Sequence, residues 1–324
     1  MFLWRKKEEV EGVIIVHVDD MLYFGSQEFH LKIIKKLKNT FKISRDEQGS
    51  FKYLGVNMVQ TKHEITMEQR AYVEGLQINL IDKELLKDKN RYATVQEMKL
   101  FRHGVGQLGW LENTTRPEIG FTFCQLSTVQ TKPQMRDFSI YAKAVKEMKS
   151  CDSLIRIVKL DTSTLVVKAY SDASYGNLPG GGSQLGYIVF LCDARGNAVP
   201  ISWTSKKAKR VARSTLTAET FAAGEGVDSA RLVKLVIEEV LGGRLPPIEL
   251  YVDNKSLVDT VHTTNTISEK SLRIDMAALR QMVDRKELKI QWVSHENQLA
   301  DVLTKQGANK EKLRDVLSKG VLKN

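Results

Sequence analysis

The sequence predicts a mixed α/β fold for the second half of this 324-residue chain. Apolar runs rich in β-branched residues, typical of strands, occur at 165–171, 185–191 and 199–204. A long helical pattern follows at 215–241, and then another strand pattern at 248–252. Acidic residues end the first and the last of these strands, so we expect carboxylates at the ends of neighbouring strands in one sheet.

The remaining elements of the second half continue this alternation of strands and helices. Apolar spacing predicts helices at 256–261 and 272–285, a strand at 288–293, and helices at 298–304 and 310–317.

The first hundred residues predict an α+β arrangement. Strands at 13–18 and 21–24 flank Asp19 and Asp20, which we expect in the turn of a hairpin. The other expected elements are a helix at 28–41, a hairpin of strands 51–60 and 65–67, and a short helix at 70–80.

Residues 97–149 predict three helices, and a β-rich segment follows them. The helices are expected at 97–111, 117–129 and 136–149, and the β-rich segment at 151–158. We therefore divide the chain into residues 1–95, 96–158 and 159–324.

Four carboxylates in the second half, each in its own motif, are candidate metal ligands. They are Asp172 in KAYSDASYGN, Glu219 in STLTAETFAA, Asp253 in IELYVDNKSL and Asp301 in HENQLADVLT. A fold that gathers them would hold two Mg²⁺ or Mn²⁺ ions about 3.5–4 Å apart, the arrangement of two-metal phosphodiester cleavage. Each acid taken singly is better explained as a surface residue at the end of a strand or helix, whereas the four acids taken together with the order of their motifs favour the metal site.

Charge and cysteine content restrict the partners and the location. The net charge is +10 and is shared between both halves of the chain. This even distribution favours a polyanionic partner that contacts both halves over a basic terminus that binds nonspecifically. A solvated basic surface is the alternative. Three widely spaced cysteines support neither a disulfide framework nor a zinc site. No signal peptide and no membrane-spanning run is found in the sequence. We expect an intracellular, reducing location.

Several motifs resemble the Pol polyproteins of copia-type LTR retrotransposons. YSDASYGN, GYIVFL, PISWTSKKAKRVARSTLTAET, YVDNKSLV, LRIDMAALRQMV and WVSHENQLADVLTK resemble their ribonuclease H domain over residues 165–306. VIIVHVDDMLYFGS is similar to the palm hairpin of a reverse transcriptase. FKYLGVNMVQTKHEITMEQRAYVEGL and NTTRPEIGFTFCQLSTVQTKP resemble the segments that lead through the thumb and connection.

The resemblance implies a fold class for each part of the chain. It implies a ribonuclease H-like mixed five-stranded sheet with flanking helices at 159–324. This domain would be preceded by an α+β palm-edge and thumb-like remnant at 1–95 and a helical connection at 96–158.

The implied reaction is metal-dependent endonucleolytic hydrolysis of the RNA strand of RNA–DNA hybrids. Polymerase activity is not expected from this chain alone, because Asp19 and Asp20 lack the further aspartate and the fingers that a polymerase needs. The alternatives are a catalytically silent nucleic-acid-binding remnant and a relic without function. Further partners would be the missing polymerase portion or other retroelement proteins, in a cytoplasmic particle or the nucleus, and the oligomeric state stays open.

Further candidate residues surround the four acids. His295 would shuttle a proton during hydrolysis, and an exposed loop histidine is the alternative. A basic stretch before the helix at 215–241 would follow the phosphates of the hybrid, unless it is a solvated charge run. Ser214 or Thr215 would cap that helix, whose start is also a natural phosphate contact. The basic residues of the stretch are Lys206, Lys207, Lys209, Arg210 and Arg213.

Overall fold

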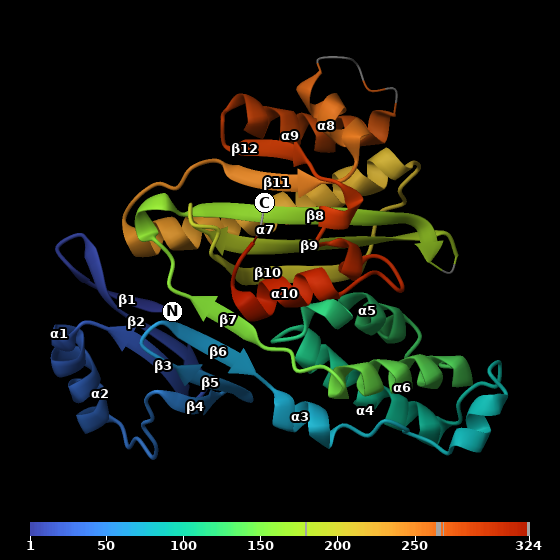
Figure 1. Cartoon of the computed structure of the whole chain (residues 1–324), viewed down its shortest axis with the longest axis horizontal. Coiled ribbons are helices and arrows are strands. Elements are labelled where there is room, and N and C mark those ends of the chain that lie inside the picture. Colours follow the sequence, from blue (N-terminus) through green and yellow to red (C-terminus); the bar gives the residue numbers. More distant parts are fainter. Residues whose placement is uncertain (179, 264–266, 268, 323–324) are drawn as a thin grey trace.

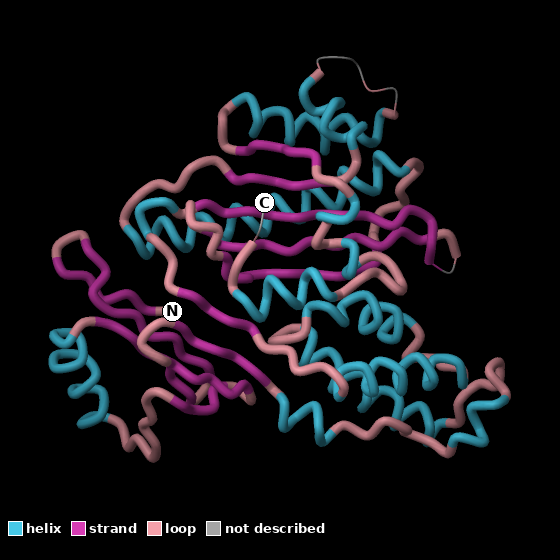
Figure 2. Tube along the Cα trace, viewed as in Figure 1, coloured by secondary structure: helices cyan, strands magenta, loops and turns pink. Residues whose placement is uncertain are grey.

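The part of the chain that the structure describes forms three β-sheets and a group of helices (Figure 1). The computed structural model describes residues 1–178, 180–263, 267 and 269–322. Its sheets have the strand orders β10-β9-β8-β11-β12, β4-β5-β6-β7 and β1-β2-β3. Figure 2 shows that the five-stranded sheet and its helices form one layered unit, with the two smaller sheets and the helical group on one side.

The five-stranded sheet is mixed, as predicted. β8, β9 and β10 pair antiparallel in a meander, whereas β11 runs parallel to both β8 and β12. The two parallel connections run through helices, as crossovers between parallel strands require. The bounds are β8 (Val166–Leu178), β9 (Gly182–Cys192), β10 (Ala198–Lys207), β11 (Ile248–Val252) and β12 (Leu288–Trp292).

Helices bury both faces of this sheet. Val167 and Val189 belong to the core beneath α7, whereas their neighbours Ile188 and Phe190 belong to the core beneath α10. This alternation follows from the two-residue period of a strand and requires apolar residues on both faces. The helices are α7 (Thr215–Leu241), α8 (Lys255–His262), α9 (Arg273–Asp284) and α10 (Glu311–Lys319).

The smaller sheets lie in the first half of the chain. The predicted hairpin is present as β2 and β3, and β1, which the apolar pattern did not predict, pairs with β2. The expected strand at 51–60 is wrong: Leu54 and Gly55 adopt positive φ and turn it back on itself as β4 and β5. The bounds are β1 (Phe2–Lys6), β2 (Glu9–His17), β3 (Asp20–Gly25), β4 (Ser50–Tyr53), β5 (Val56–Gln60) and β6 (Glu64–Glu68).

Each of the five helices predicted in the first 150 residues has a helical counterpart, but the one expected at 28–41 is divided into α1, a π-helical turn and α2. Thr94 and Glu97 form a capping box that starts α4. The predicted helix at 70–80 is shorter and ends at Gly75. The bounds are α1 (Gln27–Phe29), α2 (Lys35–Thr40), α3 (Arg70–Gly75), α4 (Val95–Glu112), α5 (Gly120–Thr128) and α6 (Met135–Lys149), with a π-helical turn at His30–Ile34 between α1 and α2. In the described part of the chain, no helix is long and apolar enough to cross a membrane.

A strand and an ion-pair network connect the three predicted parts. β7 (Ile155–Val158) pairs antiparallel with β6, so the first two parts share a sheet. Arg314 of α10 reaches the helical part, where its guanidinium lies 2.8 Å from the Glu147 carboxylate and 3.5 Å from the buried Glu118. Lys310 also contacts Glu147, at 3.0 Å. The division at 95/96 and 158/159 stays a prediction.

Candidate metal centre

The four predicted carboxylates converge at one end of the five-stranded sheet. Asp172 lies within β8, Glu219 in the second turn of α7, and Asp253 directly after β11. Asp301 begins a 3-10 turn, η7 (Asp301–Leu303). The structure therefore brings together four side chains from segments that lie up to 129 residues apart in the sequence.

Two groups of potential ligands share Asp253. Asp172, Glu219 and Asp253 form one group, and Asp253, His295 and Asp301 form the other. In each group one ligand atom per residue lies within 4.8 Å of the others. Two adjoining groups of oxygen and imidazole ligands are a suitable frame for two cations.

Two local expectations were wrong in detail. β8 does not end before Asp172 but continues to Leu178, because it pairs with β9 far beyond its contact with β11. Asp172 thus projects just past the last residue that pairs with β11. Within the predicted helix at 298–304 the structure has a 3-10 turn, η7, and another 3-10 turn, η6 (His295–Asn297), precedes it. Lys305, just after η7, contacts both Asp301 and Asp172.

Burial and mutual repulsion perturb the acids. Burial, together with the charges of Asp301 and Asp253, raises the pKa of Asp172 to about 6, although Lys305 opposes the rise. Burial, with the charges of Asp172 and Asp253, also holds the pKa of Glu219 well above its usual value. The pKa of Asp301 is raised by its burial as well. These acids occupy a site that disfavours negative charge unless a cation compensates it.

Glu219 provides a test of whether the residues fit a metal. It is only 4% exposed, and its Oε2 has no hydrogen-bond partner among the described residues. The backbone N–H of Ala173 donates a hydrogen bond to the same carboxylate. A buried carboxylate oxygen without a partner is costly, and oxygen is the ligand that Mg²⁺ prefers. The donor set therefore fits divalent metal ions.

His295 lies against the acids as predicted. Its Nδ1 is 2.9 Å from Asp301 Oδ2 and 3.2 Å from Asp253 Oδ2, while two thirds of its side chain (66%) stays exposed. Because carboxylates only accept hydrogen bonds, Nδ1 donates. The imidazole ring thus contacts both the carboxylates of the site and the solvent.

Thr304 and Lys305 complete the site, and the sequence reasoning missed both. The buried Thr304 hydroxyl donates to Asp172 Oδ2, and Lys305 Nζ lies 3.3 Å from Asp172 Oδ1. Lys305 Nζ also donates to Asp301 Oδ1 at 2.7 Å. The signal was available, since an acid and a lysine four residues apart come close wherever the backbone turns helically.

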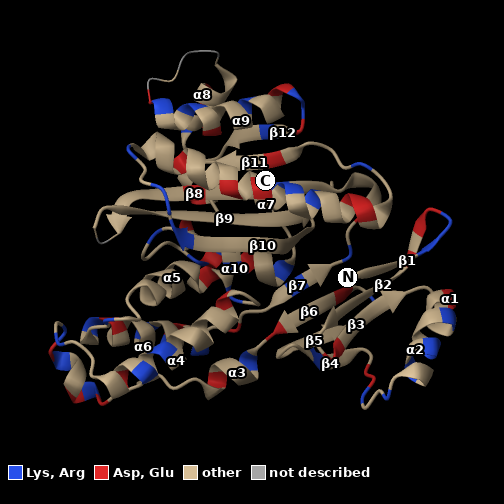
Figure 3. Ribbon diagram, turned by 180° about the vertical axis from the view of Figure 1, so that it is seen from behind, with Lys and Arg blue, Asp and Glu red and all other residues tan. Residues whose placement is uncertain are grey.

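The predicted basic stretch is partly occupied by internal ion pairs. Lys206 contacts Glu225 at 2.7 Å, and Arg210 makes a bidentate contact with Asp275 while lying over the Phe221 ring. Lys207, Lys209 and Arg213 are exposed. Figure 3 shows that basic residues are also spread over the other sheets and the helices.

The start of α7 is capped from two sides. Ser214 is the N-cap and accepts a hydrogen bond from the Thr217 N–H, whereas Thr215 is the exposed first residue of the helix. Glu269 accepts hydrogen bonds from the Thr217 hydroxyl at 2.7 Å and from Ser214. A carboxylate of the chain thus lies where a phosphate contact was predicted.

Asp19 and Asp20 lie apart from this centre. The turn of their hairpin is formed by Val18 and Asp19, and Asp20 is the first residue of β3. Both are exposed. No group of three potential metal ligands among the described residues includes either of them.

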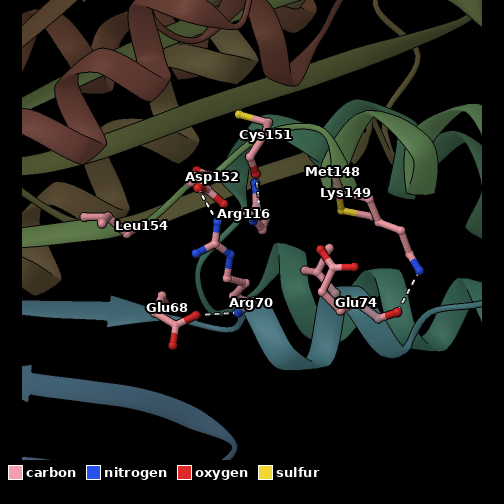
Figure 4. A pocket seen from close by; sticks show the side chains of 11 residues that line it. Glu68, Arg70, Glu74, Arg116, Met148, Lys149, Cys151, Asp152 and Leu154 are labelled. Carbon is pink, nitrogen blue, oxygen red and sulfur yellow. Dashed lines mark hydrogen bonds and ion pairs between the residues drawn. The ribbon is translucent and has the colours of Figure 1, made fainter.

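A separate hollow lies where α3 meets the segment after α6 (Figure 4). Several of its charged side chains are paired within the protein: Arg70 binds Asp152, and Lys149 donates to the Glu74 carbonyl at 2.6 Å. No group of three potential metal ligands among the described residues lies in this hollow, so the four-carboxylate centre is the candidate metal site.

Comparison with curated proteins found transposon polyproteins. The chain is 28% identical over 310 residues to the retrovirus-related Pol polyprotein from transposon RE1 of Arabidopsis thaliana, which covers 90% of this chain and 20% of that protein. It is 26% identical over 318 residues to the corresponding polyprotein from transposon TNT 1-94 of Nicotiana tabacum, covering 90% and 23%. The chain therefore spans about a fifth of the length of these relatives. No protein-family model matches it.

Solved structures with similarity include nucleases and a viral polymerase. RNase H1 from Halobacterium salinarum is 18% identical over 43% of this chain and 93% of its own, with a TM-score of 0.33. The foamy viral protease-reverse transcriptase in complex with dsDNA is 16% identical over 87% and 55%, with a TM-score of 0.45.

The strand order and directions of the five-stranded sheet confirm the predicted ribonuclease H-like fold. The homologues confirm the resemblance that the sequence motifs predicted. Over nine tenths of its length, this chain is homologous to the retrovirus-related Pol polyproteins of Ty1/copia-type transposons.

Proposed function

We propose that the chain is a metal-dependent nuclease that hydrolyses the RNA strand of RNA–DNA hybrids. The observation that carries the proposal is the convergence of Asp172, Glu219, Asp253 and Asp301 at one end of the sheet. Three of the four are buried, which is rare for acids unless a cation or a hydrogen-bond network compensates them. Mg²⁺ or Mn²⁺, two ions in all, would be held by these residues.

The residues of the chain supply the remaining chemistry. When bound, such cations activate a water molecule for attack on phosphorus and stabilise the departing oxygen. Asp172 and Glu219, fixed on β8 and α7, provide rigid oxygen ligands. His295, held by Asp253 and Asp301 yet mostly exposed, is placed to pass a proton between the site and solvent.

The hybrid as substrate is supported by the motifs and by the surface near the site. The motifs around all four acids resemble a ribonuclease H domain. Lys207, Lys209 and Arg213 are exposed along the segment that leads to Glu219, where they would contact phosphates without reading sequence. Lys206 and Arg210 would have to leave Glu225 and Asp275 to do the same. Recognition would rest on backbone shape and 2′-hydroxyls, so sequence preference should be weak.

The first two parts of the chain would support the nuclease. We assign residues 1–95 to a palm-edge and thumb-like remnant, 96–158 to a connection and 159–324 to the nuclease domain. The exposed positions of Asp19 and Asp20, apart from the carboxylate centre, support a turn in a hairpin as their role.

Cleavage of a labelled RNA–DNA hybrid by the purified protein tests the proposal. With Mg²⁺ or Mn²⁺, the RNA strand should be cut, leaving 5′-phosphate and 3′-hydroxyl ends, and Asp172→Asn should abolish cutting. Double-stranded DNA and double-stranded RNA are the comparison substrates. A folded wild-type protein that binds the hybrid without cutting it would refute the enzyme and leave the silent nucleic-acid-binding alternative.

A further inference from the structure

Lys305 is a cation of the chain itself that lies inside the candidate metal centre. Its Nζ is 2.7 Å from Asp301 Oδ1 and 3.3 Å from Asp172 Oδ1, so the ammonium bridges one carboxylate of η7 and one of β8. The two partners are nearly buried, at 11% and 1% exposure of their side chains, whereas Lys305 is 34% exposed. A flexible lysine stem allows such a group to leave for solvent without moving its backbone.

We propose that Lys305 is a positioning residue that holds Asp172 and Asp301 together in the metal-free protein and must be displaced by the cation that uses these oxygens. This inference rests on the proposed metal centre. It goes beyond that centre because it predicts that the two groups of potential ligands bind a cation with different affinities.

The asymmetry follows from the partners of each carboxylate. Both oxygens of Asp172 already accept hydrogen bonds, Oδ2 from Thr304 and Oδ1 from Lys305. Glu219 Oε2, in the group of potential ligands that Glu219 forms with Asp172 and Asp253, has no hydrogen-bond partner in the described structure. A cation between Asp172, Glu219 and Asp253 meets the ammonium at Asp172 Oδ1, but in Glu219 it gains an oxygen that nothing else satisfies in the described structure. A cation between Asp253, His295 and Asp301 competes with the ammonium at Asp301 Oδ1, and no unpaired buried oxygen among the described residues of that group offsets the competition.

Competition with Lys305 lowers the apparent affinity of the Asp253–His295–Asp301 group for a cation. A ligand that binds only the fraction of molecules in which Lys305 has moved away has its dissociation constant raised in inverse proportion to that fraction. Lys305 also compensates part of the negative charge when no metal is present. Removing the Lys305 charge should therefore lower the stability of the metal-free protein and raise the affinity of the protein for metal.

Calorimetric titration of the full chain with Mn²⁺ and Mg²⁺ measures the effect. Lys305→Met keeps the length of the stem and removes the charge. We expect the weaker of two dissociation constants to fall about tenfold, within the usual range for coupling between a site and a competing conformation. The control is Lys319→Met, which removes an exposed lysine from another aspartate–lysine pair at the same four-residue spacing, with Asp315. It should change neither constant by more than about twofold.

Thermal unfolding provides a readout that does not require metal. In EDTA, Lys305→Met should unfold at a lower temperature than the wild type, and saturating Mg²⁺ should raise its midpoint by more than it raises that of the wild type. Equal constants in Lys305→Met and Lys319→Met would overturn the inference while leaving the metal centre intact. A wild-type protein that binds neither ion would overturn both.

A measurement on the wild type covers the case in which Lys305→Met does not fold. Amine-reactive labelling followed by peptide mass spectrometry reports the exposure of each lysine. Labelling of Lys305 should rise several-fold when Mg²⁺ saturates the protein, while that of Lys319 stays constant. Unchanged labelling of Lys305 at metal saturation would refute the displacement.

Discussion

Glu112 is a buried acid outside the metal centre, and it should make the stability of the protein depend on pH. It ends α4, where its backbone carbonyl accepts a hydrogen bond of 2.8 Å from Trp203 Nε1. Its side chain is 5% exposed, and no hydrogen bond or ion pair of its carboxyl group is found among the described residues. Burial raises the pKa of Glu112 from 4.5 to about 7.

The sign and size of the effect follow from linkage. The folded chain keeps the Glu112 proton to higher pH than the unfolded chain, so the stability that this proton confers is present below about pH 4.5 and is lost as pH rises to about 7. At about 1.4 kcal/mol for each tenfold change in proton affinity, the loss amounts to about 3 kcal/mol in the free energy of unfolding. Glu112→Gln has a neutral side chain at every pH. It should therefore be more stable than the wild type by about 3 kcal/mol at pH 8, and nearly equal to it at pH 4.5.

Urea unfolding in EDTA at a series of pH values between 4.5 and 8 measures this difference. The matched control is Glu118→Gln, which changes a second buried glutamate that does have partners: Arg116 at 3.3 Å and Arg314 at 3.5 Å. It should destabilise the protein at pH 8 by about 3 kcal/mol or more, because two arginines lose their compensating charge. If Glu112→Gln is no more stable than the wild type at pH 8, burial of an uncompensated charge at this position is refuted.

Three further outcomes test the site and its support. Mg²⁺ at a hundred times its dissociation constant should stabilise the wild type by about 2.7 kcal/mol in thermal or urea unfolding, and Asp253→Asn should remove the stabilisation. Gly186→Ala would place a Cβ 2.7 Å from Leu303 in η7 and should cost about 1–3 kcal/mol in urea unfolding. Gly224→Ala, which meets nothing within 4 Å inside α7, should instead stabilise by about 1 kcal/mol, and equal effects of the two alanines would refute the close approach of η7. Lys209→Ala should weaken hybrid binding and reduce the slope of log K against log salt by about one, and an unchanged slope would exclude a phosphate contact there.

Much of the fold was predictable because most of its strands are apolar runs rich in β-branched residues. The helix at 215–241 and the strand at 248–252 were placed to the residue, since both are bounded by clear signals. A serine cap and a following glycine bound the helix, and two prolines before the strand and an aspartate after it bound the strand. The four acids were found because each stands in its own motif. Sequence motifs also implied their convergence, which periodicity alone does not show.

The parts that were not predictable depend on contacts between distant segments. The extension of β8 past Asp172 results from pairing with β9, and residues 172–178 have no apolar run that would indicate it. The turn at Leu54 needs a positive φ at a residue that rarely adopts one, so no propensity indicates it. Lys305 was missed because a lysine near a carboxylate in sequence is usually a surface pair.

Because Arg314 pairs with the helical part, the stability of that part depends on a segment that the ribosome makes later. Its partner Glu147 precedes it by 167 residues, so the helical part is synthesised well before α10 leaves the ribosome. Until then Glu118 has Arg116 as its arginine partner, and Glu147 lacks both Lys310 and Arg314. The helices would thus emerge with Glu147 lacking these partners and gain their full stability only when α10 docks. Ribosome stalling before and after residue 314, followed by limited proteolysis of the nascent chain, would show whether the helices become more resistant to protease once α10 is present.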